Sequence, residues 1–148
     1  MVIGFTGTRN GMTNEQISQV CRILHSFRAS DECEGLHGDC IGADADFDAA
    51  CAALQIPTQC RPCTFENLRA RCTDAISKPM APMDRNRAIV ADADVMIACP
   101  PNYTPIKRGS GTWATIGFAK RAGKRLIVVY PDGRVDDSCP SIVNKVDF

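Results

Sequence analysis

The chain has 148 residues, of which 45% are hydrophobic and 23% are charged, and its 17 basic residues balance 17 acidic ones. This length fits one domain that buries its own core, so we expect residues 1–148 to fold as a single unit. The zero net charge excludes a strong overall field toward nucleic acid or a membrane surface.

The first residues lack the basic segment and apolar core of a secretory signal, and no apolar stretch approaches the roughly 18 residues that cross a bilayer. We therefore expect a cytoplasmic protein with no membrane partner. The nine cysteines are odd in number and lie in a chain large enough to form a core, so reduced thiols are expected instead of a disulfide framework.

The first half of the chain alternates strand and helix patterns. Residues 2–6 predict a strand, and Thr13 with Gln16 forms a capping box that opens a helix to about residue 29. A short strand at 34–37 leads to a helix marked by Phe47, Ala50, Cys51 and Leu54. Residues 57–60 predict a third strand.

The second half begins with residues 61–82, where three prolines break any long element. A short helix is expected at 65–72, and the whole stretch is a lid or an irregular insertion. A helix at 82–93, a strand at 95–99, a helix at 113–122 and a strand at 125–130 follow. A turn at 131–133 precedes an edge strand expected at 141–146.

This alternation predicts an α/β fold, a single Rossmann-like doubly wound domain with a mostly parallel sheet of about five strands. Ligands of such sheets bind beyond the carboxyl ends of the strands, where strand order reverses. The loops at 7–12, 38–44, 83–87 and 107–112 should therefore converge.

The turn Arg108-Gly-Ser-Gly-Thr-Trp113 is the most informative of these loops. It follows an apolar strand and opens a helix, so it presents unpaired backbone N–H groups and the positive end of the helix dipole. Lys107 and Arg108 add positive charge, and the turn contains no carboxylate. This pattern favours a phosphate group.

The loop after the first strand contains Gly7, Arg9 and Gly11. The glycines relieve crowding at a strand-to-helix turn, and Arg9 can bind a phosphate through its planar guanidinium. A tight turn without a ligand explains the glycines equally well. Neither a dinucleotide-binding fingerprint nor a P-loop is present, which disfavours both of those standard sites.

The stretch His37-Gly-Asp-Cys-Ile-Gly-Ala-Asp44 opens an acidic helix. Acidic residues in a first turn stabilise the helix dipole, which explains Asp46 and Asp48 without a ligand. Because carboxylates repel phosphate, this end suits sugar hydroxyls, a base edge or a cation. Asp39 and Asp44 are the candidate catalytic carboxylates.

Asn86 shares a helix face with Ile89, Val90 and Ala93, so it should point inward at the ligand end of its helix. Its partner is either a neighbouring loop or a ligand. Arg85 and Arg87 cannot both point inward.

Cys60 and Cys63 have the spacing of a redox or metal pair. A zinc site needs four ligands, and only Cys72 and a histidine are available as further candidates. We therefore expect no metal site and no cofactor, and the role of this pair stays open.

Taken together, the stretches 7–9, 37–44, 85–90 and 109–116 resemble the SLOG superfamily of Rossmann-like proteins, in particular its YspA-like branch, which is related to the DprA and lonely-guy families. The resemblance covers residues 2 to about 133. It implies binding of a nucleotide or a nucleotide-derived ligand at the glycine loops. The ligand-binding residues are then Gly7, Thr8, Arg9, Gly38, Gly42, Arg85, Asn86, Arg108, Gly109, Ser110, Gly111 and Thr112.

Lonely-guy proteins remove the base from nucleoside 5′-monophosphates, with a glutamate at the end of their glycine motif as the catalytic residue. Thr115 stands at that position here. The resemblance therefore leaves two alternatives, a protein that only binds the nucleotide and an N-glycosidase-type hydrolase that acts on a nucleoside monophosphate or an ADP-ribose-like molecule. We expect no nucleic-acid partner, and a homodimer is an open alternative because related folds often pair through helices.

Overall fold

The computed structural model describes residues 1–106 and 110–138. The elements, in chain order, are β1 (Val2–Gly7), α1 (Asn14–Ser30), β2 (Glu34–His37), α2 (Ala43–Ala53), β3 (Thr58–Cys60), the 3-10 turn η1 (Glu66–Leu68), α3 (Pro82–Asp92), β4 (Val95–Cys99), α4 (Gly111–Arg121), β5 (Arg125–Val129) and β6 (Val135–Ser138). No helix among these residues is long and apolar enough to cross a membrane.

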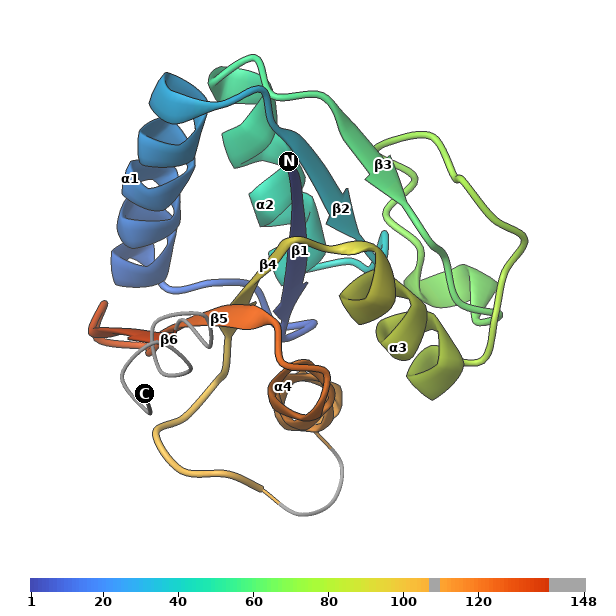
Figure 1. Ribbon diagram of the computed structural model, residues 1–148. Helices are drawn as coiled ribbons and strands as arrows, with labels where there is room; N and C mark the ends of the chain where they lie inside the picture. The colour runs from blue at the N-terminus through green and yellow to red at the C-terminus, as the bar shows by residue number, and fades with distance from the viewer. Residues whose placement is uncertain (107–109, 139–148) are drawn as a thin grey trace.

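The strands form one sheet in the order β3-β2-β1-β4-β5-β6. The first five strands of the chain are parallel to one another, and β6 runs antiparallel to β5. The chain moves outward from β1 to β3 and then crosses back to β4, so strand order reverses between β1 and β4 (Figure 1). The doubly wound α/β fold predicted from the sequence is confirmed.

The helices cover the two faces of the sheet (Figure 1). One apolar cluster joins α1 and α2 to the sheet through residues such as Leu24, Phe47 and Phe5, and a second joins α3 and α4 to the other face through Ile89, Ile116 and others. All five residues of β4 are buried. A fully apolar run is typical of a strand covered on both faces.

The capping box that begins α1 is present, because the Thr13 side chain accepts from the backbone N–H of Gln16 while the Gln16 side chain accepts from the Thr13 N–H. The buried Gln16 amide also donates to the carbonyls of Pro100 and Val129, at 2.9 and 3.0 Å. These bonds tie the start of α1 to the carboxyl ends of β4 and β5, the edge on which a ligand site is expected.

The sheet has one strand more than the five expected. The turn at 131–133 reverses the chain at Gly133, whose φ is +87°, and β6 returns along β5. Its four residues are all exposed, so no hydrophobic alternation marked it in the sequence. The edge strand expected at 141–146 lies outside the described residues.

The segment between β3 and α3 is irregular, and the helix expected at 65–72 is reduced to the single turn η1. The segment runs along the outer side of β3 through backbone bridges from Cys60 to Ala75 and from Cys63 to Met80. A further bridge joins Arg69 to Cys40 in the loop after β2. The prolines explain why no regular element forms between these contacts.

Candidate functional site

A cavity of about 660 Å³ opens at the carboxyl ends of the strands. This volume lies in the range of roughly 300–1,000 Å³ that small-molecule sites occupy. Its lining comes from the ends of β1 and β2, from the segment before α3, from the first turns of α2, α3 and α4, and from the loop after β4. The cavity therefore lies where strand order reverses, as expected for this fold.

The structure brings most of the sequence-predicted site residues to this cavity. Those that line it are Gly7, Thr8, Arg9, Gly38, Asp44, Arg85, Asn86, Ser110, Gly111 and Thr112. Gly42 and Asp39 do not line it. Arg108 and Gly109 lie outside the described residues.

The first turn of α4 offers free backbone donors to the cavity. Ser110 is the N-cap, and its side chain accepts from the backbone N–H of Trp113. Among the described residues, the N–H groups of Gly111 and Thr112 have no acceptor, and the turn contains no acidic residue. This end of α4 is therefore suited to an anion.

Arg85 is the strongest polar feature of the cavity. The residue is only 6% exposed, and its side chain donates to the carbonyl of Gly38 at 2.6 Å and to the side-chain oxygen of Asn86 at 2.7 Å. Gly38 permits this approach, because a Cβ there would lie 2.3 Å from the guanidinium. No carboxylate among the described residues forms an ion pair with Arg85. The Asp44 carboxyl is near enough to interact electrostatically with Arg85, but without a direct ion pair a buried guanidinium remains costly in an empty site.

Two further groups extend this polar region. Arg9 is exposed at the end of β1, lines the cavity and makes no ion pair within the described part of the chain. Asn86 is 9% exposed, and its amide nitrogen lies 3.8 Å from the position of a Cβ at Gly111. The amide therefore lies between the starts of α3 and α4. Arg87, by contrast, is exposed and pairs with Asp84.

Asp44 is a buried carboxyl that lines the cavity. One of its oxygens accepts from the backbone N–H groups of Gly38 and Cys40, at 3.2 and 3.1 Å. Burial raises the pKa of Asp44, although nearby His37 and Arg85 and the two N–H donors act in the opposite direction. A carboxyl with a raised pKa can hold and release a proton at a reacting atom.

Asp39 faces away from the cavity, toward the segment before α3. Its side chain accepts from the Arg69 guanidinium at 3.1 Å and from the backbone N–H of Cys72 at 3.1 Å. Burial opposes ionisation, but the hydrogen bonds from Cys72 and Arg69 together lower the pKa of Asp39. Of the two candidate catalytic carboxylates, only Asp44 is placed to reach a ligand in the cavity.

The pKa of Asp39 gives a testable pH dependence. A carboxyl whose pKa is lowered in the folded state stabilises the fold at pH values above its ordinary pKa of 3.8. This contribution disappears as the pH falls through the folded-state pKa. Wild type should therefore be more stable than Asp39→Asn at pH 6, and the gap should narrow at pH 3. Urea unfolding at the two pH values measures this, and a gap that is unchanged would contradict the assignment.

His37, Asp39 and Cys72 are residues of metal-binding type whose ligand atoms lie within 4.8 Å of one another. The His37 Nδ1 accepts from the backbone N–H of Asp39 at 2.9 Å, so the neutral ring carries its proton on Nε2, which faces Asp48 at 2.9 Å. The nitrogen nearest Cys72 then has no lone pair to offer. Burial and the nearby carboxylates also raise the pKa of the Cys72 thiol to about 12. This arrangement is satisfied by its own hydrogen bonds.

Cys60 and Cys63 form no disulfide, and both residues are buried. Burial raises the pKa of Cys60 to about 11, which disfavours a reactive thiolate. Of the two, Cys63 lines the cavity and Cys60 does not; Cys40 also lines it.

The apolar lining of the cavity was not found from the sequence. Ile41, Phe65, Leu68, Met83 and Ile106 all line it. Phe65 and Leu68 lie in the stretch with no periodicity, and single apolar residues in loops carry no signal of their own. Only the fold shows that they face one ligand site.

No protein-family model matches the chain, and no curated protein matches it in sequence. Several solved structures, however, are similar to it in fold. A molybdenum cofactor binding protein from Rippkaea orientalis is 17% identical with a TM-score of 0.67, over 99% of this chain and 97% of that one. The structural-genomics target TM1055 is 16% identical with a TM-score of 0.62, over 84% and 71% of the two chains.

DNA processing protein A from Helicobacter pylori, described with a single-stranded DNA binding mode, is 17% identical with a TM-score of 0.59, over 99% of this chain and 72% of that one. At these identities the likeness concerns the fold. The chain therefore has a Rossmann-like fold similar to that of these proteins.

Proposed function

We propose that this protein binds a nucleotide or a nucleotide-derived ligand in the cavity, with the phosphate at the first turn of α4. The observation that carries the proposal is Arg85, a buried guanidinium that lines the cavity and has no carboxylate partner among the described residues. A phosphate beside it would supply the direct ion pair that Asp44, which interacts with Arg85 only at longer range, does not form. The free N–H groups of Gly111 and Thr112 at the start of α4, and the exposed Arg9 after β1, would add further donors.

Hydrolysis of such a ligand is the alternative within the same site. Thr115, at the position of the lonely-guy glutamate, is 1% exposed and donates to the carbonyl of Gly111 in its own helix at 2.8 Å. It lies outside the lining and carries no charge. Asp44 is the carboxyl among the described residues that lines the cavity, so an N-glycosidase reaction would depend on it to stabilise the oxocarbenium-like sugar.

A molybdenum cofactor is a second candidate ligand. The observation that favours it is the match to the molybdenum cofactor binding protein over nearly the whole of both chains. The lining of the cavity offers such a ligand both basic and apolar residues. The molybdenum content of the purified protein, measured by elemental mass spectrometry, distinguishes this ligand from a plain nucleotide.

Mass spectrometry of the protein incubated with nucleoside monophosphates, dinucleotides and ADP-ribose isomers tests these alternatives. A retained, intact nucleotide after desalting would support binding alone. Released base that is lost in Asp44→Asn would establish the hydrolase, and full turnover in that variant would remove Asp44 from the mechanism. Retention of none of these ligands, with single-stranded DNA retained instead, would contradict the proposal.

A further inference from the structure

Exposed apolar side chains gather at the cavity. The large hydrophobic residues that are exposed in the described part of the chain are Ile41, Phe65, Ile76, Met83, Tyr103, Ile106 and Val135. Four of these seven line the cavity, namely Ile41, Phe65, Met83 and Ile106. Phe65 is the most exposed of them, at 53%. Clustered apolar surface of this kind marks a place that a ligand or a partner covers.

Three of the lining residues are linked to one another through their backbones. The backbone N–H of Ile41 donates to the carbonyl of Leu68 at 2.9 Å, and the N–H of Leu68 donates to the carbonyl of Phe65 at 3.0 Å. The backbones of Ile41, Phe65 and Leu68 are therefore neighbours, and all three residues line the cavity. We call them the apolar wall. No member has a charged or amide side chain. The side chains of the wall can therefore give a ring apolar contact area, but no hydrogen bonds to the polar atoms at the edge of the ring.

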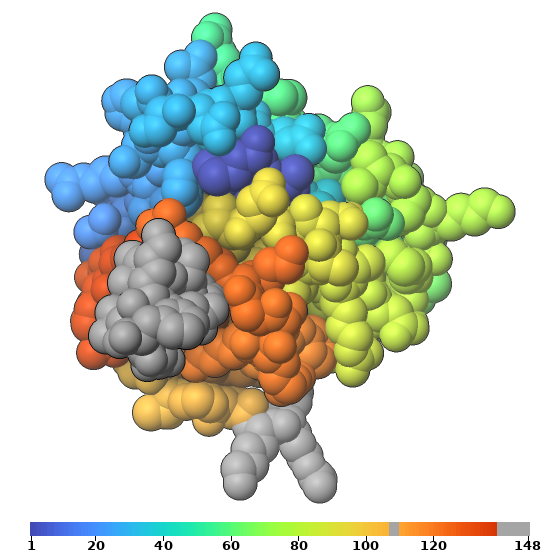
Figure 2. All heavy atoms as spheres, in the orientation of Figure 1, coloured from blue at the N-terminus to red at the C-terminus, as the bar shows by residue number. Residues whose placement is uncertain are grey.

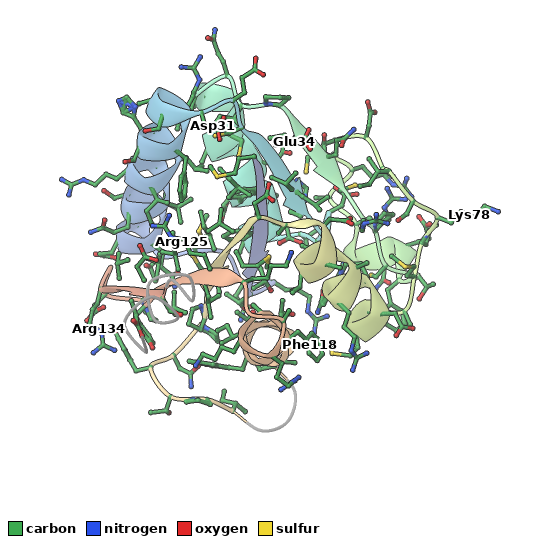
Figure 3. The ribbon with its side chains drawn as sticks, viewed as in Figure 1. Asp31, Glu34, Lys78, Phe118, Arg125 and Arg134 are labelled. Carbon is green, nitrogen blue, oxygen red and sulfur yellow. The ribbon has the colours of Figure 1, made fainter. Side chains whose placement is uncertain are left out.

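Asp39 binds the segment that follows the Phe65 and Leu68 part of this wall. Its backbone is in the left-handed region, with φ of +57°, and its carbonyl accepts from the N–H of Ala70 at 2.7 Å. Its two carboxylate oxygens accept from Arg69 and Cys72, as described above. The carbonyl and the two carboxylate oxygens of one buried residue therefore bind residues 69–72, which follow directly after Leu68. The whole segment between β3 and α3 is the yellow-green region at the right of Figure 2. Lys78 points away from the molecule at the outer edge of this segment (Figure 3).

We propose that the apolar wall binds the ring of the ligand by stacking and apolar contact, and that Asp39 is a positioning residue for this wall. The inference rests on the proposed function, because it takes the phosphate to lie at α4. The ligand class is then a phosphate ester that carries an uncharged planar heterocycle. Affinity should follow the area of the ring more than its hydrogen-bond pattern, so AMP and GMP should bind similarly, and both should bind more tightly than CMP or UMP.

Calorimetric titration with AMP and with ribose 5-phosphate, which lacks the ring, tests this inference. Phe65→Ala should weaken AMP binding by roughly 5- to 150-fold, the usual range for loss of one aromatic stacking partner. Ribose 5-phosphate should bind the variant as it binds wild type. Ile76→Ala is the matched control, because Ile76 is 41% exposed on the same segment but does not line the cavity; neither affinity should change in it.

Asp39→Asn should lower the affinity for AMP while leaving that for ribose 5-phosphate in place, provided that its melting curve shows a folded protein. A purely structural role would move both affinities together. The inference is overturned if wild type binds AMP no more tightly than ribose 5-phosphate, or if Phe65→Ala weakens both ligands equally. Wild type that binds neither ligand would instead overturn the proposed function itself.

Discussion

Replacing Arg85 with methionine is expected to weaken AMP binding roughly 100-fold or more, because truncating one partner of a buried charge pair usually has an effect of this size. Methionine fills most of the same space, and it removes a buried charge that forms no ion pair with a carboxylate among the described residues. The empty variant should therefore stay folded. Isothermal calorimetry measures the affinity, and the loss of AMP-induced thermal stabilisation provides a second readout.

Arg87→Met is the matched control for this experiment. Arg87 lies on the same helix, but its side chain is 58% exposed and it pairs with Asp84 and packs on the Phe118 ring. Its substitution removes the same charge from the protein and should change AMP affinity less than twofold or so, as expected for an exposed pair. If both variants lose affinity equally, the effect is one of net charge, and the site assignment is wrong. An Arg85→Met protein that binds AMP normally would place the phosphate elsewhere.

The fold could be predicted because its signals are local. The apolar run of β4, the capping box at Thr13 and the spacing of apolar residues in α1 each identify an element without knowledge of the others. The convergence of the four loops followed from topology alone, since parallel strands end on one edge. That is why Arg9, Asn86 and Gly111 could be grouped before any contact was known.

The roles of the two carboxylates and the apolar lining of the site could not be predicted, because they depend on contacts between residues that are far apart in the sequence. Asp39 and Asp44 are equivalent in sequence, as carboxylates flanking the same glycine loop. Their roles separate only because Arg69 and Cys72, more than twenty-five residues further on, bind Asp39, while Asp44 accepts from its own loop. The apolar wall has the same origin, because a stretch without periodicity gives no clue to which of its side chains face inward.

Replacing Gly42 with alanine is expected to cause the largest loss of stability among single-methyl changes at the site. Gly42 has φ of +94° and ψ of −125°, a region that only glycine enters readily. A Cβ there would lie 2.2 Å from the carbonyl oxygen of Arg9 and 2.4 Å from its carbon. Backbone atoms cannot swing aside as a side chain does, so the start of α2 must separate from the loop after β1.

The expected loss is roughly 3–5 kcal/mol of unfolding free energy, from the backbone strain and the overpacking together. Gly123→Ala is the control, since Gly123 also has a positive φ of +67° but no atom within 4 Å of its Cβ position; it should lose only about 1–2 kcal/mol. Urea unfolding compares the two variants. Equal losses would mean that the contact with Arg9 is absent in solution. A larger loss in Gly42→Ala, accompanied by weaker AMP binding in the protein that remains folded, would show that Gly42 serves the site by holding the Arg9 loop in place.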